Sequence, residues 1–283
     1  MTPTSPIPAI LAIILALFTC FLLMKKFGPP DEPGRFLAID GLRGHLAFGV
    51  FIHHSIIWFF YLKTGQWVSP PSNLYAHFGQ TSVAFFFMIT GFLFFSKILD
   101  GKTKKIDWLR LYVSRFLRLM PLYCIAMSAL FLIVLILSGA NVNEQVSTLL
   151  RKIIQWMSFT ILGNPDINGV ERTSIIMSGV TWSLPYEWFF YLILPAFALL
   201  NRVRVGWGYL VISAVAVILI FIKGTVPYHW LSFAGGMSAA YFVRFEYMCK
   251  IFRKRIFSVV VILLISTTVI FYPSPHGLMQ ISM

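Results

Sequence analysis

Two adjacent histidines, His53 and His54, lie inside an apolar run that is long enough to cross a membrane. Histidine has an ordinary pKa near neutrality, so it can take or release a proton under physiological conditions. His54 follows the start of the run at His45 by nine residues, which corresponds to about 13 Å of helix. An ionisable side chain at that depth is costly and usually faces a cavity or a partner. One of the two histidines is therefore a candidate general base; the alternative is a neutral histidine that is hydrogen-bonded between helices.

A carboxylate, Glu187, is the only acidic residue inside any of the expected membrane spans, and it lies about one turn into the apolar run 183–200. Trp182 and Ser183 precede it, and Tyr191 follows one turn later. Tryptophan at the start of a span is ordinary interfacial anchoring. A lone carboxylate within a span, by contrast, is a functional candidate by default.

Charged residues also stand at the entrances of two other apolar runs. Arg115 and Arg118 are three residues apart and so share a helical face. The planar guanidinium group binds phosphate through two parallel hydrogen bonds, as a phosphate-bearing donor would require. The alternative is that both arginines only mark the cytoplasmic side of the membrane. Arg35, Asp40 and Arg43 lead into the helix of His54, where they form either the mouth of a site or ordinary interfacial charge.

Helices in a membrane must position these residues. The chain of 283 residues is 58% hydrophobic and 12% charged, whereas soluble chains carry about 25% charged residues. The apolar stretch 153–162, with Trp156 at its centre, is too short to cross and suits an interfacial or re-entrant segment. We therefore expect an all-α, polytopic transmembrane helix bundle with about eight spans. The spans are expected near residues 7–24, 45–62, 79–99, 119–138, 183–200, 206–222, 228–243 and 256–272.

The basic residues of the loops predict an orientation. If the loop 25–44 is cytoplasmic and the sides alternate, the cytoplasmic segments hold 18 of the 23 Lys and Arg residues, as the positive-inside rule requires. Because the basic residues form short clusters between apolar runs, the net charge of +13 argues for lipid contact and against nucleic-acid binding. Cys20, Cys124 and Cys249 match no metal-site or disulfide spacing, so no metal is expected.

Four segments together resemble the acyltransferase family 3 membrane proteins, which O-acylate extracytoplasmic glycans and related acceptors. The family pattern R-x(4)-D-G-L-R-G, followed by a histidine eleven residues after the second Arg, matches at Arg35, Asp40, Arg43 and His54. This register selects His54 over His53. The pattern F-F-x-[IV]-S-G-[FY] is similar to residues 86–92, with Thr90 in place of the usual serine. The pattern R-x-x-R-x-x-P matches at Arg115, Arg118 and Pro121. The pattern W-S-L-x-x-E-x-x-F-Y-x-x-x-P matches at Trp182, Ser183, Leu184, Glu187, Phe190, Tyr191 and Pro195.

The resemblance implies an acyl-CoA co-substrate on the cytoplasmic side, most often acetyl-CoA, and no bound cofactor. The acceptor would be a hydroxyl of an extracytoplasmic glycan, such as a polysaccharide or lipopolysaccharide, or of a lipid-linked sugar, at the inner or plasma membrane. The catalytic residues would be His54, as general base or acyl carrier, and Glu187. Donor binding would fall to Arg43, Arg115 and Arg118. Structural or acceptor-side roles would fall to Arg35, Asp40, Thr90, Trp182, Ser183 and Tyr191.

The chain departs from the family pattern at both ends. Residues 1–34 form an additional transmembrane anchor and linker before the acyltransferase domain expected over residues 35–283. The chain also ends soon after Tyr272, with fewer spans than the family core has, so a C-terminally truncated, inactive relative is one alternative. A transporter or export component is another, because intramembrane His and Glu residues also serve proton relays. A transporter would show inverted repeats with discontinuous helices, and the sequence shows none.

Overall fold

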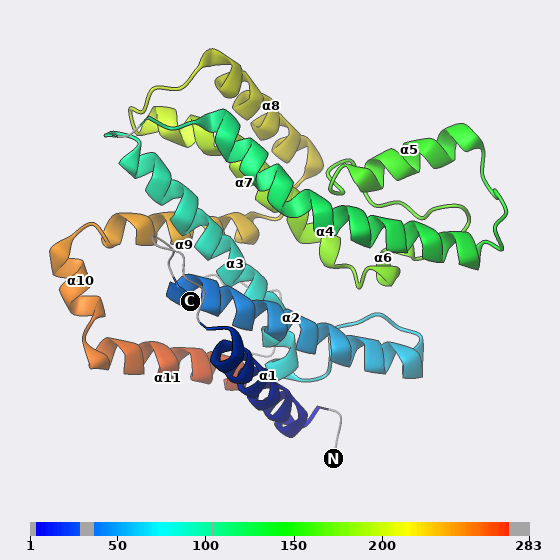
Figure 1. Ribbon diagram of the computed structural model, residues 1–283, viewed down its shortest axis with the longest axis horizontal. Coiled ribbons are helices and arrows are strands. Elements are labelled where there is room, and N and C mark those ends of the chain that lie inside the picture. The colour runs from blue at the N-terminus through cyan, green and yellow to red at the C-terminus, as the bar shows by residue number, and fades with distance from the viewer. Residues whose placement is uncertain (1–3, 29–36, 104, 272–283) are drawn as a thin grey trace. The chain divides into compact units, whose positions relative to one another are not determined.

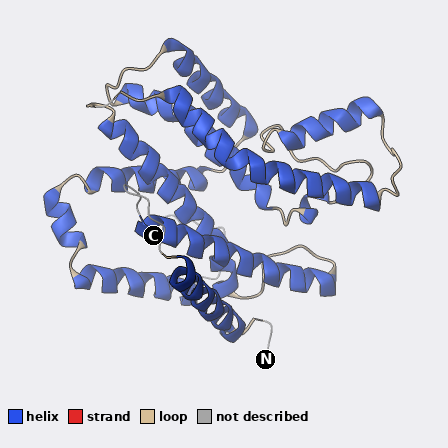
Figure 2. Ribbon diagram, viewed as in Figure 1, coloured by secondary structure: helices blue, strands red, loops and turns tan. Residues whose placement is uncertain are grey.

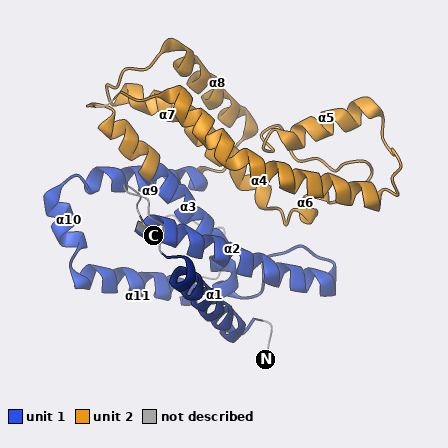
Figure 3. Ribbon diagram, in the orientation of Figure 1, with its two compact units in different colours: residues 1–92, 228–283 blue, residues 93–227 orange. Residues whose placement is uncertain are grey.

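The structure is a computed structural model that describes residues 4–28, 37–103 and 105–271. Over these residues the chain forms helices and no strands (Figure 1, Figure 2). The chain divides into two compact units, shown in different colours in Figure 3. Unit 1 comprises residues 1–92 and 228–283, and unit 2 comprises residues 93–227. Arg35 and most of the expected linker lie outside the described residues.

Unit 1 holds the first helices and the last ones. They are α1 (Pro6–Phe27), α2 (Leu37–Thr64), α3 (Asn73–Asp100) as far as Phe92, α9 (Pro227–Phe242), α10 (Glu246–Phe252) and α11 (Arg255–Phe271). The α1 helix contacts α2 and α3 through Ala9, which is buried beside Ile52 and Tyr75. The Tyr75 hydroxyl also donates a hydrogen bond to the Ser5 carbonyl, 2.9 Å away. Most other side chains of α1 are exposed and apolar, as expected for a helix that faces lipid.

Two glycines let α3 and α9 pack with their backbones in contact. A Cβ atom on Gly91 would overlap the carbonyl oxygen of Phe233, and one on Gly236 would overlap the carbonyl oxygen of Met88. Beside this crossing, the rings of Phe87 and Phe233 stack with centroids 4.5 Å apart. Close approach at small residues is a common source of stability between membrane helices.

Unit 2 contains the end of α3 followed by α4 (Trp108–Leu137), α5 (Val146–Met157), α6 (Thr173–Ile176), the 3-10 helix η1 (Val180–Trp182), α7 (Ser183–Leu200) and α8 (Trp207–Lys223). The α4 helix begins where the Asp107 carboxylate accepts a hydrogen bond from the Arg110 N–H at 2.9 Å, which caps the free N–H groups of the first turn. The α7 and α8 helices pack against each other. The Ser213 hydroxyl of α8 donates to the Leu192 carbonyl of α7 at 2.7 Å.

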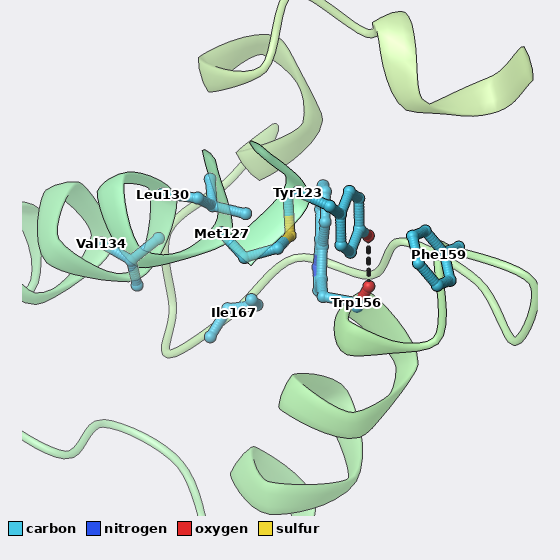
Figure 4. Close-up of a cluster of buried hydrophobic side chains, with 7 residues drawn as sticks. All are labelled: Tyr123, Met127, Leu130, Val134, Trp156, Phe159 and Ile167. Atoms are coloured by element: carbon cyan, nitrogen blue, oxygen red, sulfur yellow. Dashed lines mark hydrogen bonds between the residues drawn. The ribbon is translucent and has the colours of Figure 1, made fainter. Parts of the chain in front are cut away.

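A buried cluster ties α4 to the segment that follows it (Figure 4). Its members are Tyr123, Met127, Leu130, Val134, Trp156, Phe159 and Ile167. The Tyr123 hydroxyl donates a hydrogen bond to the Trp156 carbonyl at 2.5 Å, and the Trp156 indole N–H donates to the Pro165 carbonyl at 2.8 Å. Trp156 has no exposed surface. The tryptophan expected to suit an interfacial segment is therefore a core residue of unit 2.

Each expected span coincides with a helix, but not every helix is long enough to count as a span. Five helical segments within the described residues are long and apolar enough to cross a membrane: Pro6–Phe27, Ala38–Thr64, Asn73–Asp100, Trp108–Leu137 and Val180–Leu200. The α10 and α11 helices, bent by 65° at their junction, give a sixth if they form one span. The α8 and α9 helices have 17 and 16 residues. The structure is thus that of a helical, multi-pass membrane protein, and it does not confirm the expected count of about eight spans.

Candidate active site

His53 is a packed residue of unit 1. Its Nδ1 donates a hydrogen bond to the backbone carbonyl of Tyr75 on α3, 2.7 Å away. Its ring occupies the space over Gly79, where any Cβ atom would overlap it. The side chain is buried. These contacts are those of a histidine that is hydrogen-bonded between two helices, and they hold α2 against α3.

His54 has a different environment. Its ring lies edge-on to that of His53, with centroids 5.0 Å apart, and is stacked with the Trp67 indole at 6.3 Å. Its Nδ1 is enclosed by protein and has no hydrogen-bond partner among the described residues. Buried polar atoms are nearly always paired, and an unpaired one calls for an explanation such as a functional role. Of the two histidines, His54 is therefore the one with unused hydrogen-bonding capacity.

Three other residues of the first two motifs lie on the same pair of helices. Arg43 and His54 are eleven residues apart, which puts them on nearly the same face of α2 and about 16 Å apart along its axis. The Arg43 guanidinium lies over the Phe86 ring, 6.0 Å from its centroid. Asp40 is exposed in the first turn of α2, and Thr90 is buried on α3.

Unit 2 brings three predicted site residues together. The Tyr191 hydroxyl donates a hydrogen bond to the Glu187 carboxylate, and the Arg115 guanidinium of α4 lies beside the same hydroxyl. Arg115 lies over the Phe94 ring at 5.1 Å, and that ring packs against Tyr191 with centroids 4.8 Å apart. Tyr191 is only 2% exposed, so its hydroxyl depends on these protein partners. The end of α3, α4 and α7 thus converge on one charged, hydrogen-bonded group.

A cavity of about 370 Å³ adjoins this group at the turn between α3 and α4. Four cationic side chains line it: Lys97, Lys105, Arg110 and Arg115. Two carboxylates, Asp100 and Asp107, also line the cavity. Asp107 in addition caps α4. A concave surface with an excess of cations attracts anions, and arginine is suited to phosphate because its planar group binds two oxygens at once. The cavity is therefore a candidate site for a phosphate-bearing ligand.

The remaining predicted residues lie apart from this cavity. Arg118 is exposed and is not among the residues that line it. The Trp182 ring packs edge-on against Tyr186 at 6.0 Å. Ser183 lines a second, mostly apolar cavity of about 310 Å³, together with Thr181, whose buried hydroxyl has no partner within the part of the chain that the structure describes. Within that same part, no group of three or more His, Cys, Asp or Glu side chains is arranged to hold a metal ion.

Comparison with known protein families decides the class of the protein. The sequence matches the acyltransferase-domain family, acyltransferase family 3, over residues 36–282. The chain belongs to acyltransferase family 3. The match begins after α1, which precedes the family domain. A search of curated proteins and a search of solved structures found no match.

This family 3 acyltransferase has candidate site residues that the motifs do not mark. Lys97, Lys105 and Arg110 line the cationic cavity with Arg115, but in the sequence they look like loop charges that set orientation. Gly101 lies at the turn that brings the two sides of this cavity together. The one signal in the sequence is that these cations fall within the same short segment, 97–118, as the R-x-x-R motif.

Proposed function

We propose that this membrane acyltransferase moves an acyl group from cytoplasmic acyl-CoA to a hydroxyl of an extracytoplasmic glycan or lipid-linked sugar. Acetyl is the expected group, and the inner or plasma membrane is the expected location. The observation that carries the proposal is the cationic cavity beside Arg115 and the hydrogen-bonded pair Tyr191 and Glu187.

On the donor side, Arg115 and the other cations of the cavity would hold the phosphates of CoA. The turn between α3 and α4 belongs to the Lys- and Arg-rich segments that the positive-inside rule assigns to the cytoplasm, where acyl-CoA is available. Arginine would fix the orientation of the phosphates, and the lysines would add unoriented charge. Arg43 and Arg118 are further donor contacts that the family pattern suggests.

On the acceptor side, His54 would act as general base. It would take the proton from the acceptor hydroxyl, whose oxygen attacks the carbonyl carbon of the thioester. The carbon–sulfur bond then breaks, and the proton passes from the imidazolium to the CoA sulfur, so that CoA leaves as its thiol. In the alternative order, His54 carries the acyl group first, and the products are the same.

Glu187 and Tyr191 would bind hydroxyls of the acceptor. A carboxylate accepts hydrogen bonds from sugar hydroxyls, and the hydrogen bond from Tyr191 keeps the Glu187 side chain in one orientation. Structural or acceptor-side roles are expected for the other motif residues: Arg35, Asp40, Thr90, Trp182 and Ser183.

Mass spectrometry of surface glycans tests this function. Cells that express the chain are compared with cells that express His54→Ala at an equal level in the membrane. We expect an added acyl mass on a glycan only with the wild-type chain, and transfer of label from acetyl-CoA in membrane vesicles from the same cells. Identical glycan masses in the two strains would refute the proposal. A transporter would change the amount of exported glycan and leave its mass unaltered.

A further inference from the structure

Three aromatic side chains of unit 1 form a continuous group beside His54. Trp58 and Tyr61 follow His54 by four and seven residues on α2 and so lie on the same helical face. Trp67 lies in the loop after α2. The ring centroids are 5.5 Å apart for Trp58 and Tyr61, 5.5 Å for Tyr61 and Trp67, and 5.9 Å for Trp58 and Trp67. We call Trp58, Tyr61 and Trp67 the aromatic platform.

The platform combines accessible ring surface with a direct contact to the candidate base. Trp58 is 43% exposed, and Tyr61 and Trp67 are half-buried. Trp67 is also stacked on the His54 imidazole at 6.3 Å. Tryptophans at the ends of spans often anchor a protein at the membrane interface. Anchoring accounts for an exposed ring such as Trp207, which is 83% exposed at the start of α8, but it does not require rings that pack on one another and on a histidine.

The position of the platform along the chain fits the acceptor side. It lies at the C-terminal end of α2 and in the loop before α3. The segment between these two helices is poor in Lys and Arg, and the positive-inside rule assigns such segments to the extracytoplasmic side. An extracytoplasmic glycan would therefore approach His54 from the end of α2 that carries the platform.

We propose that the aromatic platform binds a pyranose ring of the acceptor and presents one of its hydroxyls to His54. A pyranose has a face made largely of C–H bonds, while its hydroxyls project from the edge of the ring. Aromatic faces carry negative charge density, which attracts the weakly positive C–H hydrogens and leaves the hydroxyls free to hydrogen-bond. The His54 side chain is only half-buried, so a sugar ring held on the platform would bring a hydroxyl to its imidazole.

Direct binding of simple sugars tests the platform. Saturation-transfer NMR is recorded with the full chain in nanodiscs and with two probes, cellotriose and the trimer of N-acetylglucosamine. We expect at least one trimer to show saturation of its C–H ring protons. The variant Trp67→Leu should weaken that binding by about tenfold, which corresponds to the loss of one favourable aromatic contact. Trp67→Phe keeps a ring and should retain most of the affinity, and sorbitol, which has no ring, should not bind.

The inference rests on the proposed function only for the chemical step, so the two can fail separately. Trp207→Leu is the matched control and should bind sugar as the wild type does, and Trp67→Leu should bind acetyl-CoA with unchanged affinity. No saturation with either trimer, or equal sugar affinity in Trp67→Leu and wild type, would overturn the platform. Sugar binding without any acyl transfer by the wild-type chain would instead refute the proposed function and leave the platform in place.

Discussion

The Tyr191 hydroxyl donates a hydrogen bond to Glu187, one turn earlier on α7. The Arg115 guanidinium of α4 lies beside the same hydroxyl, so a cation and a carboxylate flank it. A hydroxyl suits this position because its O–H donates to the carboxylate while the lone pairs of its oxygen are attracted to the cation. Tyr191 therefore links the carboxylate within the α7 span to the arginine that lines the cationic cavity.

The variant Tyr191→Phe removes this link and keeps the ring that packs against Phe94. Hydrogen bonds to charged groups contribute about 1.5–3 kcal/mol, so kcat/KM for acyl transfer should fall by about tenfold to a hundredfold. The measurement is steady-state transfer of labelled acetyl from acetyl-CoA in nanodiscs. Tyr247→Phe, at an exposed tyrosine of α10, should keep wild-type rates. Wild-type rates in Tyr191→Phe as well would contradict a role for the link in transfer.

The two arginines of the R-x-x-R motif should respond differently to lysine. Arg115 lines the cationic cavity, whereas Arg118 is exposed and outside it. Lysine keeps the charge and loses the planar group that binds two phosphate oxygens. Arg115→Lys should therefore raise the KM for the donor about tenfold, because one charge-assisted contact is lost. Donor titration with saturating acceptor gives this constant.

Arg118→Lys is the matched variant for that experiment, and it should leave the donor KM near the wild-type value. An equal rise in both variants would mean that the two guanidinium groups act together on the donor. An unchanged donor KM in both variants would mean that the two arginines only set the orientation of the chain in the membrane.

The positions of the helices could be predicted from the sequence. The expected span 183–200 coincides with α7 (Ser183–Leu200), and the expected span 206–222 differs from α8 (Trp207–Lys223) by a single residue at each end. An apolar segment in a membrane must satisfy its own backbone hydrogen bonds, and a helix does so within the segment. An apolar run therefore defines a helix with little dependence on the rest of the chain.

The polar extensions of the helices could not be read from apolar runs. The α4 helix begins at Trp108, well before the expected start of its span at residue 119, because Asp107 caps it and the polar residues beyond the cap continue the helix. The α2 helix likewise begins at Leu37, before the run at residue 45. These extensions carry Arg43 and Arg115. Apolar runs alone therefore do not predict that these two candidate site residues lie on helices.

The contacts between distant segments could not be predicted from the sequence either. The motifs select His54, Arg115, Glu187 and Tyr191 one by one, but nothing in their spacing indicates that Arg115 reaches Tyr191. The same holds for Trp67, whose stacking on His54 depends on the path of the loop after α2. Such contacts arise from tertiary packing, which periodicity and local spacing do not encode.

Because α3 and α9 cross with their backbones in contact, one added methyl group at the crossing should destabilise the fold. In Gly236→Ala the new Cβ atom would meet the Met88 backbone, which cannot move away as a side chain can. Overpacking of this kind usually costs about 1–3 kcal/mol, so the thermal unfolding temperature in detergent should fall. Gly208→Ala is the control, because a Cβ at that position on α8 has open space around it. An equal unfolding temperature for Gly236→Ala and wild type would mean that the two helices are not in backbone contact.

Acid should loosen the segment between α4 and α7. The hydrogen bond from Lys152, followed by one from the Gly169 N–H, holds the pKa of Glu144 below its ordinary value. A carboxylate with a lowered folded-state pKa stabilises the fold fully above its unfolded pKa of about 4.3 and loses this contribution as the pH falls through the folded value. Hydrogen-exchange protection of residues 141–170 should therefore decrease below about pH 4.3.

The size of that effect is limited because both partners are partly exposed. Ion pairs near the surface contribute at most about 1 kcal/mol, so protection should change by no more than about fivefold. Glu144→Gln should show the reduced protection already at neutral pH and little further change on acidification. A pH dependence in Glu144→Gln equal to that of the wild type would assign the acid sensitivity to another group.

Variants of the two adjacent histidines should distinguish a loss of stability from a loss of catalysis. His53→Ala removes the hydrogen bond to the Tyr75 carbonyl and leaves that buried oxygen unpaired, which usually costs about 1–3 kcal/mol, so the unfolding temperature should fall. The transfer rate per mole of folded protein should stay near that of the wild type. His54→Ala loses ring packing but no hydrogen bond of Nδ1 within the described residues, so the unfolding temperature should fall less than in His53→Ala.

The transfer rate of His54→Ala should fall by about a hundredfold to ten-thousandfold, the usual contribution of a general base. Both variants are purified in nanodiscs, quantified as folded protein by size-exclusion chromatography, and assayed with labelled acetyl-CoA. The pH profile adds a second readout, because loss of the base should remove the ionisation that limits the wild-type rate. Equal losses of activity in the two variants at equal folded amounts would show that the choice of His54 over His53 is wrong.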